Sequence, residues 1–288
     1  MSAGVLEDRE HLRQIKGPSA LGSDPRRLLH LTWALAATDF KLRFFGSALG
    51  YLWQLVRPLM IFGVLLTIFT QVVRLGSGVK FYAEALLLGI VLYNFLSDAT
   101  GGAVRSITER EPLVRKVEFP RLAVPLSSVL QAMFNLAMNL VVVLAFLVIA
   151  GAEIRWTWLE LPLLVAALAA LCAGLAMLLS TLFVRYRDVE PIWEVTLLVL
   201  FYGSPIFYPV QTITGAHAHT IVQLLMLNPF AAVLQQARHA LVDPSNPSFV
   251  AAAGGWWHVL PPLALTLFVI VLGGQVFRRR APRIAEDL

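Results

Sequence analysis

Four hydroxyl and amide side chains recur every fourth residue inside one long apolar stretch: Ser127, Gln131, Asn135 and Asn139. This spacing keeps them close to one face of a helix. Exposing all four polar side chains to lipid would be energetically unfavourable, so two interpretations are open. They form hydrogen bonds between helices, or they line a hydrophilic conduit. In both cases the chemistry that this face offers is hydrogen bonding.

Groups that could catalyse a reaction or hold a metal are few and scattered. Four histidines and one carboxylate fall on one side of the predicted membrane: His217, His219, His239, His258 and Asp243. No H-E-x-x-H motif or carboxylate pair accompanies them, so ordinary surface histidines explain them better than a metal or acid/base site. A membrane enzyme acting on a lipid-linked sugar would need convergent carboxylates, which the sequence lacks. We expect no catalytic residue, no bound metal and no cofactor in this chain.

No nucleotide-binding loop of the form G-x-x-x-x-G-K-[ST] occurs in the sequence. Any ATP and Mg²⁺ would therefore bind to a separate polypeptide. The only cysteine, Cys172, lies in an apolar stretch, which argues against disulfides and thiolate metal clusters. Asp98 is expected near the end of a span, so no ionisable group is expected near the middle of the membrane. This argues against ion coupling.

The composition is that of an integral membrane protein. Of the 288 residues 58% are hydrophobic and only 14% are charged, against roughly 25% charged in soluble domains. About six stretches are long enough to cross a bilayer, which takes roughly 20 residues in helical form. The sequence therefore predicts an all-α integral membrane protein with six transmembrane helices, at 55–74, 82–101, 122–150, 158–184, 192–210 and 259–277.

The basic residues fix the expected topology. Of the 23 lysines and arginines, only Arg74, Lys80, Arg155 and Arg238 fall on the predicted outer side, which places both termini in the cytoplasm. Residues 1–24 form a polar tail without the apolar core of a signal peptide, and residues 278–288 form a basic tail. The net charge of +5 is explained by attraction to anionic lipid rather than to nucleic acid.

Two cytoplasmic segments stand out. Asp24 and Pro25 resemble a helix cap and first residue, and they open an amphipathic helix expected to lie along the inner leaflet, as a simple anchor or as a mechanical element. Between the second and third spans, Pro112 and Pro120 divide a charged segment into short helical pieces. This segment is either a solvated loop or a docking site for another protein.

The fifth predicted span ends abnormally, because Gly203, Pro205 and Pro209 interrupt its outer turn. Asn228 and Pro229 then resemble the cap and first residue of a helix too short to cross the membrane. We expect outer re-entrant helices here. The aromatic side chains at the break are candidates for interfacial anchoring or for stacking on sugar rings: Phe201, Tyr202, Phe207 and Tyr208.

Three segments resemble the membrane subunits of ABC-2 class exporters of lipid-linked polysaccharides, such as O-antigen, teichoic-acid and galactan exporters. They are TDFKLRFFGSALGYLWQLVRPLM, EPLVRKVEFPRLAVPLS, and SPIFYPV with the later NPFAAVLQQARHALV. The resemblance runs from about residue 30 to the end, and the FPR tract is its most specific part. It implies that residues 25–277 form an ABC-2 type transmembrane domain.

The resemblance also implies a homodimer in the bacterial plasma membrane, docked on a nucleotide-binding ATPase subunit that hydrolyses ATP. A lipid-linked glycan would leave the cytoplasmic side through a channel between the protomers. Drug and lipid exporters of the same class share the plan and are the alternative cargo. The implied roles are coupling to the ATPase for Arg105, Glu109, Arg110, Glu111, Arg115 and Lys116; a cytoplasmic-mouth loop for Leu49, Gly50 and Tyr51; glycan contact for Gln131, Asn135, Asn139, Phe201, Tyr202, Phe207 and Tyr208; and an outer gate for Asn228 and Pro229.

Overall fold

The computed structural model describes residues 25–43, 50–74, 80–116 and 120–281. These residues form helices and connecting loops, and none of them is in a β-strand. The predicted all-α class is therefore confirmed. Asp24 and Leu49, which the sequence singled out as a helix cap and a loop residue, lie outside the described residues.

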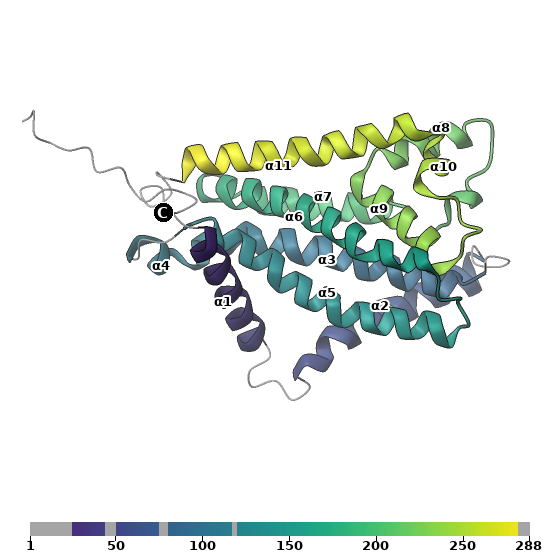
Figure 1. The fold of residues 1–288 in the computed structure, drawn as a ribbon, viewed down its shortest axis with the longest axis horizontal. Coiled ribbons are helices and arrows are strands. Elements are labelled where there is room, and N and C mark those ends of the chain that lie inside the picture. The colour runs from purple at the N-terminus through teal and green to yellow at the C-terminus, as the bar shows by residue number, and fades with distance from the viewer. Residues whose placement is uncertain (1–24, 44–49, 75–79, 117–119, 282–288) are drawn as a thin grey trace, which may run out of the picture.

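The bundle is built from long helices, most of which run side by side along the longest dimension of the molecule (Figure 1). They are α2 (Trp53–Thr67), α3 (Tyr82–Glu109), α5 (Ala123–Ile149), α6 (Glu160–Arg185), α7 (Val189–Gly203) and α11 (Leu260–Arg280). A π-helical turn at Ile68–Val72 extends α2. Short 3-10 turns lie at Gly50–Leu52, Trp156–Leu159, Val210–Thr212 and Trp256–Val259.

Five of these helices, taken with their flanking turns, are long and apolar enough to cross a membrane: Gly50–Val72, Tyr82–Glu109, Ala123–Ile149, Trp156–Arg185 and Trp256–Arg280. The remaining long helix, α7, has 15 residues, fewer than the roughly 20 that a span needs. The predicted span 192–210 was therefore too long at its outer end. Proline has no N–H for the helix and disfavours helical geometry in the residue before it, so Pro205 ends the segment early.

One end of the bundle carries α1 (Pro25–Arg43), the six-residue α4 (Glu111–Lys116) and the end of α11 (Figure 1). We call it the α4 end. Helix α1 is inclined steeply to the long helices and lies against α5, where Trp33 and Phe40 contact the Phe134 ring at centroid distances of 5.2 and 5.7 Å. Running across the span direction is what a helix at the membrane surface requires.

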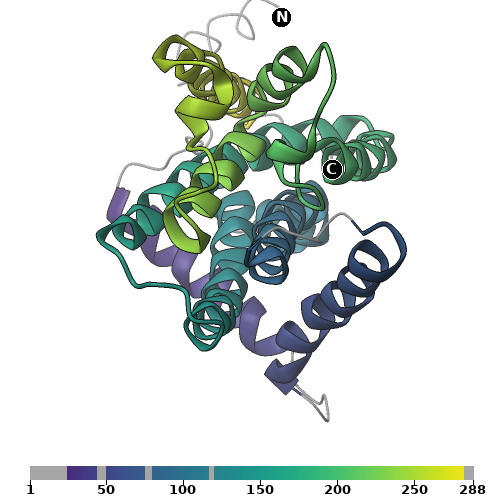
Figure 2. The ribbon, with the colours of Figure 1, turned by 90° about the vertical axis from the view of Figure 1, so that its right-hand side faces the viewer.

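The opposite end, the α9 end, is built from α8 (Ala218–Met226), α9 (Pro229–Ala237) with a π-helical turn at Arg238–Val242, and α10 (Phe249–Ala253). Figure 2 looks onto this end. Helices α8 and α9 meet at 104°, the geometry of a broken span or a re-entrant loop. The predicted start of α9 is confirmed: Pro229 is in its first turn, and Asn228 Oδ1 accepts a hydrogen bond from Phe230 N at 3.0 Å.

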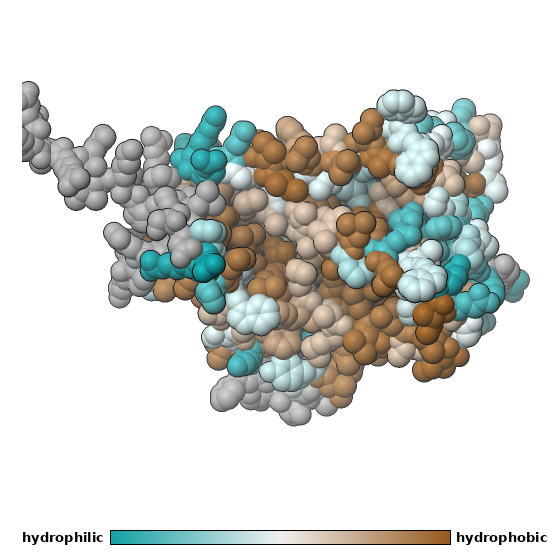
Figure 3. All heavy atoms as spheres, in the orientation of Figure 1, coloured by the Kyte–Doolittle hydropathy of each residue, from teal (hydrophilic) through white to brown (hydrophobic). Residues whose placement is uncertain are grey.

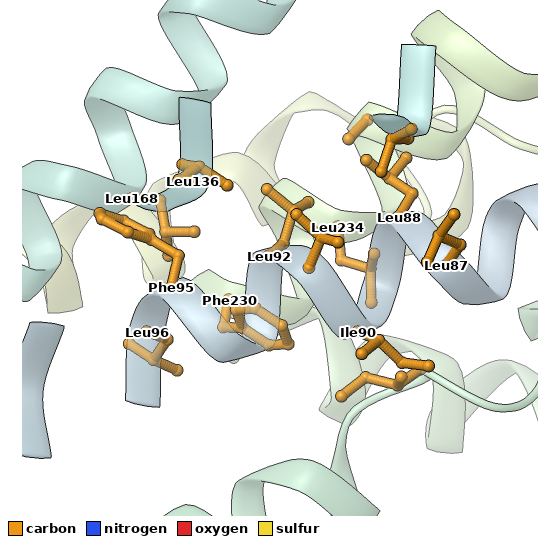
Figure 4. Packing of buried hydrophobic residues seen from close by; sticks show 14 of the residues in the cluster. Leu87, Leu88, Ile90, Leu92, Phe95, Leu96, Leu136, Leu168, Phe230 and Leu234 are labelled. Atoms are coloured by element: carbon orange, nitrogen blue, oxygen red, sulfur yellow. The ribbon is translucent and has the colours of Figure 1, made fainter. Parts of the chain in front are cut away.

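Helix α3 lies at the centre of the bundle. Its Leu92 and Phe95 pack in the same buried cluster as Leu136 of α5, Leu168 of α6 and Phe230 of α9 (Figure 4). By contrast α2 and α11 bury little of their surface. Brown apolar side chains cover the middle of the visible face, and teal polar ones gather towards the two ends (Figure 3). This is the surface of a protein that crosses a bilayer.

Helices α6 and α11 touch backbone to backbone. A Cβ atom added to Gly273 would lie 2.3 Å from the carbonyl oxygen of Gly174, and one added to Gly174 would lie 2.9 Å from Ile270 Cα. Small residues at such crossings let helices approach closely in a membrane, where van der Waals packing stabilises association. The two glycines therefore set the distance between these helices.

Candidate functional site

A polar cavity of about 610 Å³ lies between α1, α3 and α5, towards the α4 end. A smaller cavity of about 60 Å³ continues it between α2, α3 and α5. Both are lined by Ser97, Asp98, Ala132 and Asn135. We call the two together the polar cleft. Its larger part falls within the 300 to 1,000 Å³ typical of sites for small ligands.

The predicted polar face of the third span contributes three side chains to this cleft. Gln131 and Asn135 line the larger cavity, and Asn135 and Asn139 line the smaller one. Ser127 instead binds within the protein: its Oγ donates to Val124 O at 2.7 Å and accepts from Arg110 Nη1 at 3.0 Å. Hydrogen bonding within the protein is therefore confirmed for Ser127, whereas a hydrophilic conduit lined by Gln131, Asn135 and Asn139 stays a prediction.

Asp98 corrects one expectation. The second span was predicted to end near residue 101, which put Asp98 close to its end, but α3 continues to Glu109 and Asp98 lies well inside it. Its carboxylate borders both parts of the cleft, and the guanidinium groups of Arg43 and Arg57 act on it electrostatically. An ionisable side chain within a membrane span is costly, so Asp98 is a candidate for a functional role.

Asn135 lies at the centre of the cleft with 4% of its surface exposed. Neither its side-chain nitrogen nor its side-chain oxygen has a hydrogen-bond partner of ordinary geometry among the described residues, although the Asp98 carboxylate lies beside it. A buried amide without partners costs free energy, roughly 1 to 3 kcal/mol for each unsatisfied group. Apart from its contact with Asp98, the Asn135 amide thus has hydrogen-bonding capacity that the described part of the chain does not use.

Arg110 joins three elements at the α4 end. It forms a salt bridge with Asp39 of α1 and donates to Ser127 of α5, while its own position is the first after α3. Both members of the salt bridge are largely shielded from water. Arg110 therefore ties the surface helix α1 to the start of α4 rather than pointing away from the bundle.

Helix α7 is held along α3 by three polar contacts. Tyr93 Oη donates to Leu197 O at 2.7 Å, and Trp193 Nε1 donates to Thr100 Oγ1 at 3.0 Å. At the α4 end, Arg105 Nε lies 2.5 Å from Glu190 Oε1. Arg105, predicted to contact an ATPase, thus binds within the chain while 57% of its side-chain surface remains exposed.

The four aromatic candidates at the end of α7 differ in placement. Phe207 is buried, with 4% exposed, and stacks on Phe69 at 5.3 Å. Phe201 and Tyr208 are partly buried, whereas Tyr202 exposes 64% of its surface. Phe207 therefore belongs to the packing of the protomer, and Tyr202 is the ring most available to a ligand.

The segment after α7 is fixed by buried polar groups. Arg238 is 3% exposed and donates to Ile206 O at 2.7 Å, and Tyr82 Oη donates to Phe207 O at 2.6 Å. Asn228 Nδ2 also donates to Ser204 Oγ at 3.1 Å. These donors satisfy two backbone carbonyl groups and one hydroxyl group in the non-helical segment that follows α7.

The histidines do not assemble with carboxylates. Across the described ranges no three His, Cys, Asp or Glu side chains come together in a way that could hold a metal ion. His239 Nδ1 instead lies 2.7 Å from Asn246 O, and thus takes part in the packing of the α9 end.

Residues 30–242 match the family of ABC-2 type transporters. The chain belongs to this family. It is also 25% identical over 258 residues to the O-antigen export system permease protein RfbA of Myxococcus xanthus, covering 88% of this chain and 94% of that protein. Two proteins of the same name from Klebsiella pneumoniae are 24% and 26% identical over 265 residues, covering 91% of this chain and 96% of each relative. The family assigns a transport role to this chain.

The segments in which the sequence resembles ABC-2 transporters lie at the two ends of the bundle. At the α4 end, Glu111, Arg115 and Lys116 are in α4, although only the backbone of the last two is described. Gly50 and Tyr51 form the turn before α2, and Tyr51 stacks on Phe40 of α1 at 5.2 Å. Asn228 and Pro229 are at the α9 end.

Arg121 of the FPR tract has a structural explanation. Its guanidinium donates to the carbonyl oxygen of Ala281, just after α11. A cation at this position complements the partial negative charge of a helix C-terminus. Burial lowers the pKa of the guanidinium. The tract thus joins the start of α5 to the end of α11.

The charged residues of the cleft that sequence analysis did not assign to a functional site are Asp39, Arg43, Arg57 and Asp98. A signal for Asp98 was present, because Asn94 lies one helical turn before it on the same face. No comparable pattern pointed to Arg43 or Arg57, since their place depends on how α1 and α2 pack on α3.

Proposed function

We propose that this chain is the channel-forming subunit of an ATP-driven exporter that moves a lipid-linked polysaccharide out of the cytoplasm. The single observation that supports this cargo is that three relatives, each matched over most of both chains, are named O-antigen export permeases. The polar cleft supports it, because a hydroxyl-rich cargo needs hydrogen-bonding groups within the membrane.

ATP is hydrolysed by a separate nucleotide-binding subunit that docks at the α4 end. The sequence has no nucleotide-binding loop, and ABC-2 membership implies such a partner. The contacts of Arg110 would transmit a movement of α4 to other helices: to α1 through the salt bridge with Asp39, and to α5 through the hydrogen bond with Ser127. Movement of these elements would change which end of the channel is open.

Two copies of the chain form the channel in a bacterial plasma membrane, with the α4 end and both termini in the cytoplasm. The distribution of lysine and arginine supports this orientation. The exposed apolar surfaces of α2, α7 and α11 then face lipid or the second copy. Tyr202 is the best placed aromatic ring for contact with a glycan.

The test is deletion of the gene in the source bacterium, followed by complementation with the wild-type chain or with Arg115→Glu. Surface polysaccharide and lipid-linked polysaccharide inside the cell are measured on gels. Deletion should abolish surface polysaccharide and raise the amount of lipid-linked polysaccharide inside the cell. The wild-type chain should return both amounts to their original levels. Arg115→Glu should fail to export although its partner ATPase still hydrolyses ATP.

Unchanged surface polysaccharide in the deletion strain would refute the proposed cargo. The alternative of a drug exporter makes the opposite prediction, namely altered resistance to a toxic compound with a normal cell surface. Full export by Arg115→Glu would refute docking through α4.

A further inference from the structure

The geometry points to a binding site for uncharged sugar units of the cargo in the polar cleft, inside each protomer and between α1, α3 and α5. This inference rests on the proposed polysaccharide cargo and adds where the glycan binds and which chemical part of it is recognised. The ligand is the hydroxyl-rich part of the glycan rather than its phosphate groups.

The first support is the pattern of unsatisfied groups. The side chain of Asn135 is 96% buried and borders both parts of the cleft, and apart from the neighbouring Asp98 carboxylate its polar atoms have no hydrogen-bond partner among the described residues. An amide offers two donors and an acceptor with two lone pairs. Neighbouring hydroxyl groups of a sugar ring supply donors and acceptors together, so they can satisfy both atoms of this amide at once.

The second support is the balance of charge. The charged residues that line the cleft are three acids and three bases: Asp39, Asp98, Glu109, Arg43, Arg57 and Arg110. Arg110 is already paired with Asp39. A phosphate site needs an excess of cations. Here the guanidinium groups of Arg43 and Arg57 are balanced by the carboxylates of Asp98 and Glu109, which would repel an anion. The same set suits a neutral ligand, because charged groups make strong hydrogen bonds to hydroxyls.

The third support is the position of Gly101 and Gly102 in the wall of the larger cavity. A Cβ added to Gly101 would meet no heavy atom within 4 Å, so the cavity beside it is open. Glycine in the interior of a helix is unfavourable compared with residues that carry a side chain. Its presence here leaves room for a ligand to approach the backbone of α3.

Two leucine variants test this site by filling it. Gly101→Leu places a side chain in the cavity without removing any polar group. Gly274→Leu in α11 is the matched control, since its Cβ also meets no heavy atom within 4 Å but lies outside the cleft. Surface polysaccharide should fall at least tenfold with Gly101→Leu and stay at the wild-type level with Gly274→Leu. Asp98→Asn, which keeps the shape of the side chain, should also lower export.

A labelling experiment tests occupancy directly. Gly101→Cys is expressed with the partner ATPase in cells that make the polysaccharide and in cells that lack its first glycosyltransferase. Inverted membrane vesicles are treated with a charged, water-soluble maleimide. Cargo should slow the labelling of Gly101→Cys several-fold but leave Thr108→Cys unchanged, because Thr108 is on α3 outside the cleft. The wild-type chain, with its buried Cys172, is the blank.

Equal labelling with and without cargo, or normal export by Gly101→Leu, would overturn this site while the proposed cargo stands. Protection of Gly101→Cys by inorganic pyrophosphate alone would show an anion site and overturn the assignment to sugar units. If the wild-type chain restores no surface polysaccharide in the deletion strain, the proposed function fails, and this inference fails with it.

Discussion

The contact between α6 and α11 allows a quantitative test. In Gly273→Ala the new methyl group would lie 2.3 Å from Gly174 O, whereas ordinary contacts begin at 3.4 Å. The contacted oxygen belongs to the backbone, so no side chain can move aside, and the helices must separate by about 1 Å at their crossing. Overpacking of this kind costs roughly 1 to 3 kcal/mol. For a chain of this size that corresponds to a fall in melting temperature of roughly 2 to 12 °C.

Cys172 provides the assay. It is the only cysteine of the chain, it is fully buried, and it lies in α6 two residues before Gly174. A thiol-reactive fluorescent dye added to the purified protein during heating therefore reports the opening of this region. Gly273→Ala should be labelled at a lower temperature than the wild-type protein.

The neighbouring glycine is the control. Gly274→Ala adds the same methyl group where no heavy atom lies within 4 Å, and alanine favours a helix over glycine by up to about 1 kcal/mol. Its melting temperature should equal or exceed that of the wild type. If Gly273→Ala melts like the wild type, or if Gly274→Ala melts below it, the close contact does not set the packing of α11.

Two further exchanges test buried polar contacts. Arg110→Ala should reduce export while ATP hydrolysis continues, because the exchange removes the salt bridge that joins α1 to the end of α3. Adding Asp39→Asn to this variant should cause little further loss of export. Additive losses from the two exchanges would show that the salt bridge is not the link. Arg238→Met removes the donor to Ile206 O and should destabilise the protein by roughly 1 to 3 kcal/mol, measured by dye labelling of Cys172 on heating, whereas an unchanged profile would argue against this hydrogen bond as a support of the α9 end.

Hydrophobicity alone located most of the helices, since a bilayer demands long apolar stretches whatever surrounds them. The start of α9 followed from Asn228 and Pro229, because capping depends on adjacent residues. The end of α3 at Glu109 could not be predicted in this way. Its last turns carry Arg105 and Glu109, which resemble a loop in sequence, but Val104 and Ile107 between them are buried in apolar clusters with residues of other helices.

The candidate site was predictable only in part. Helical spacing placed Gln131, Asn135 and Asn139 on one polar face, and the structure has all three at the cleft. The charges opposite them come from α1, α2 and α3, and their arrangement depends on packing between distant segments. The same limit applies to Phe207, whose burial depends on Phe69 of the π-helical turn after α2.

The bond between Arg121 and Ala281 has a practical consequence for handling the protein. It anchors Ala281, just after α11, beside the start of α5. Only residues 282–288 separate Ala281 from a purification tag or fluorescent protein at the C-terminus, so the fused protein is tethered near the α4 end, where the ATPase is proposed to dock, and would obstruct assembly of the complex. Fusion partners and immobilisation chemistry are therefore better attached to another part of the chain.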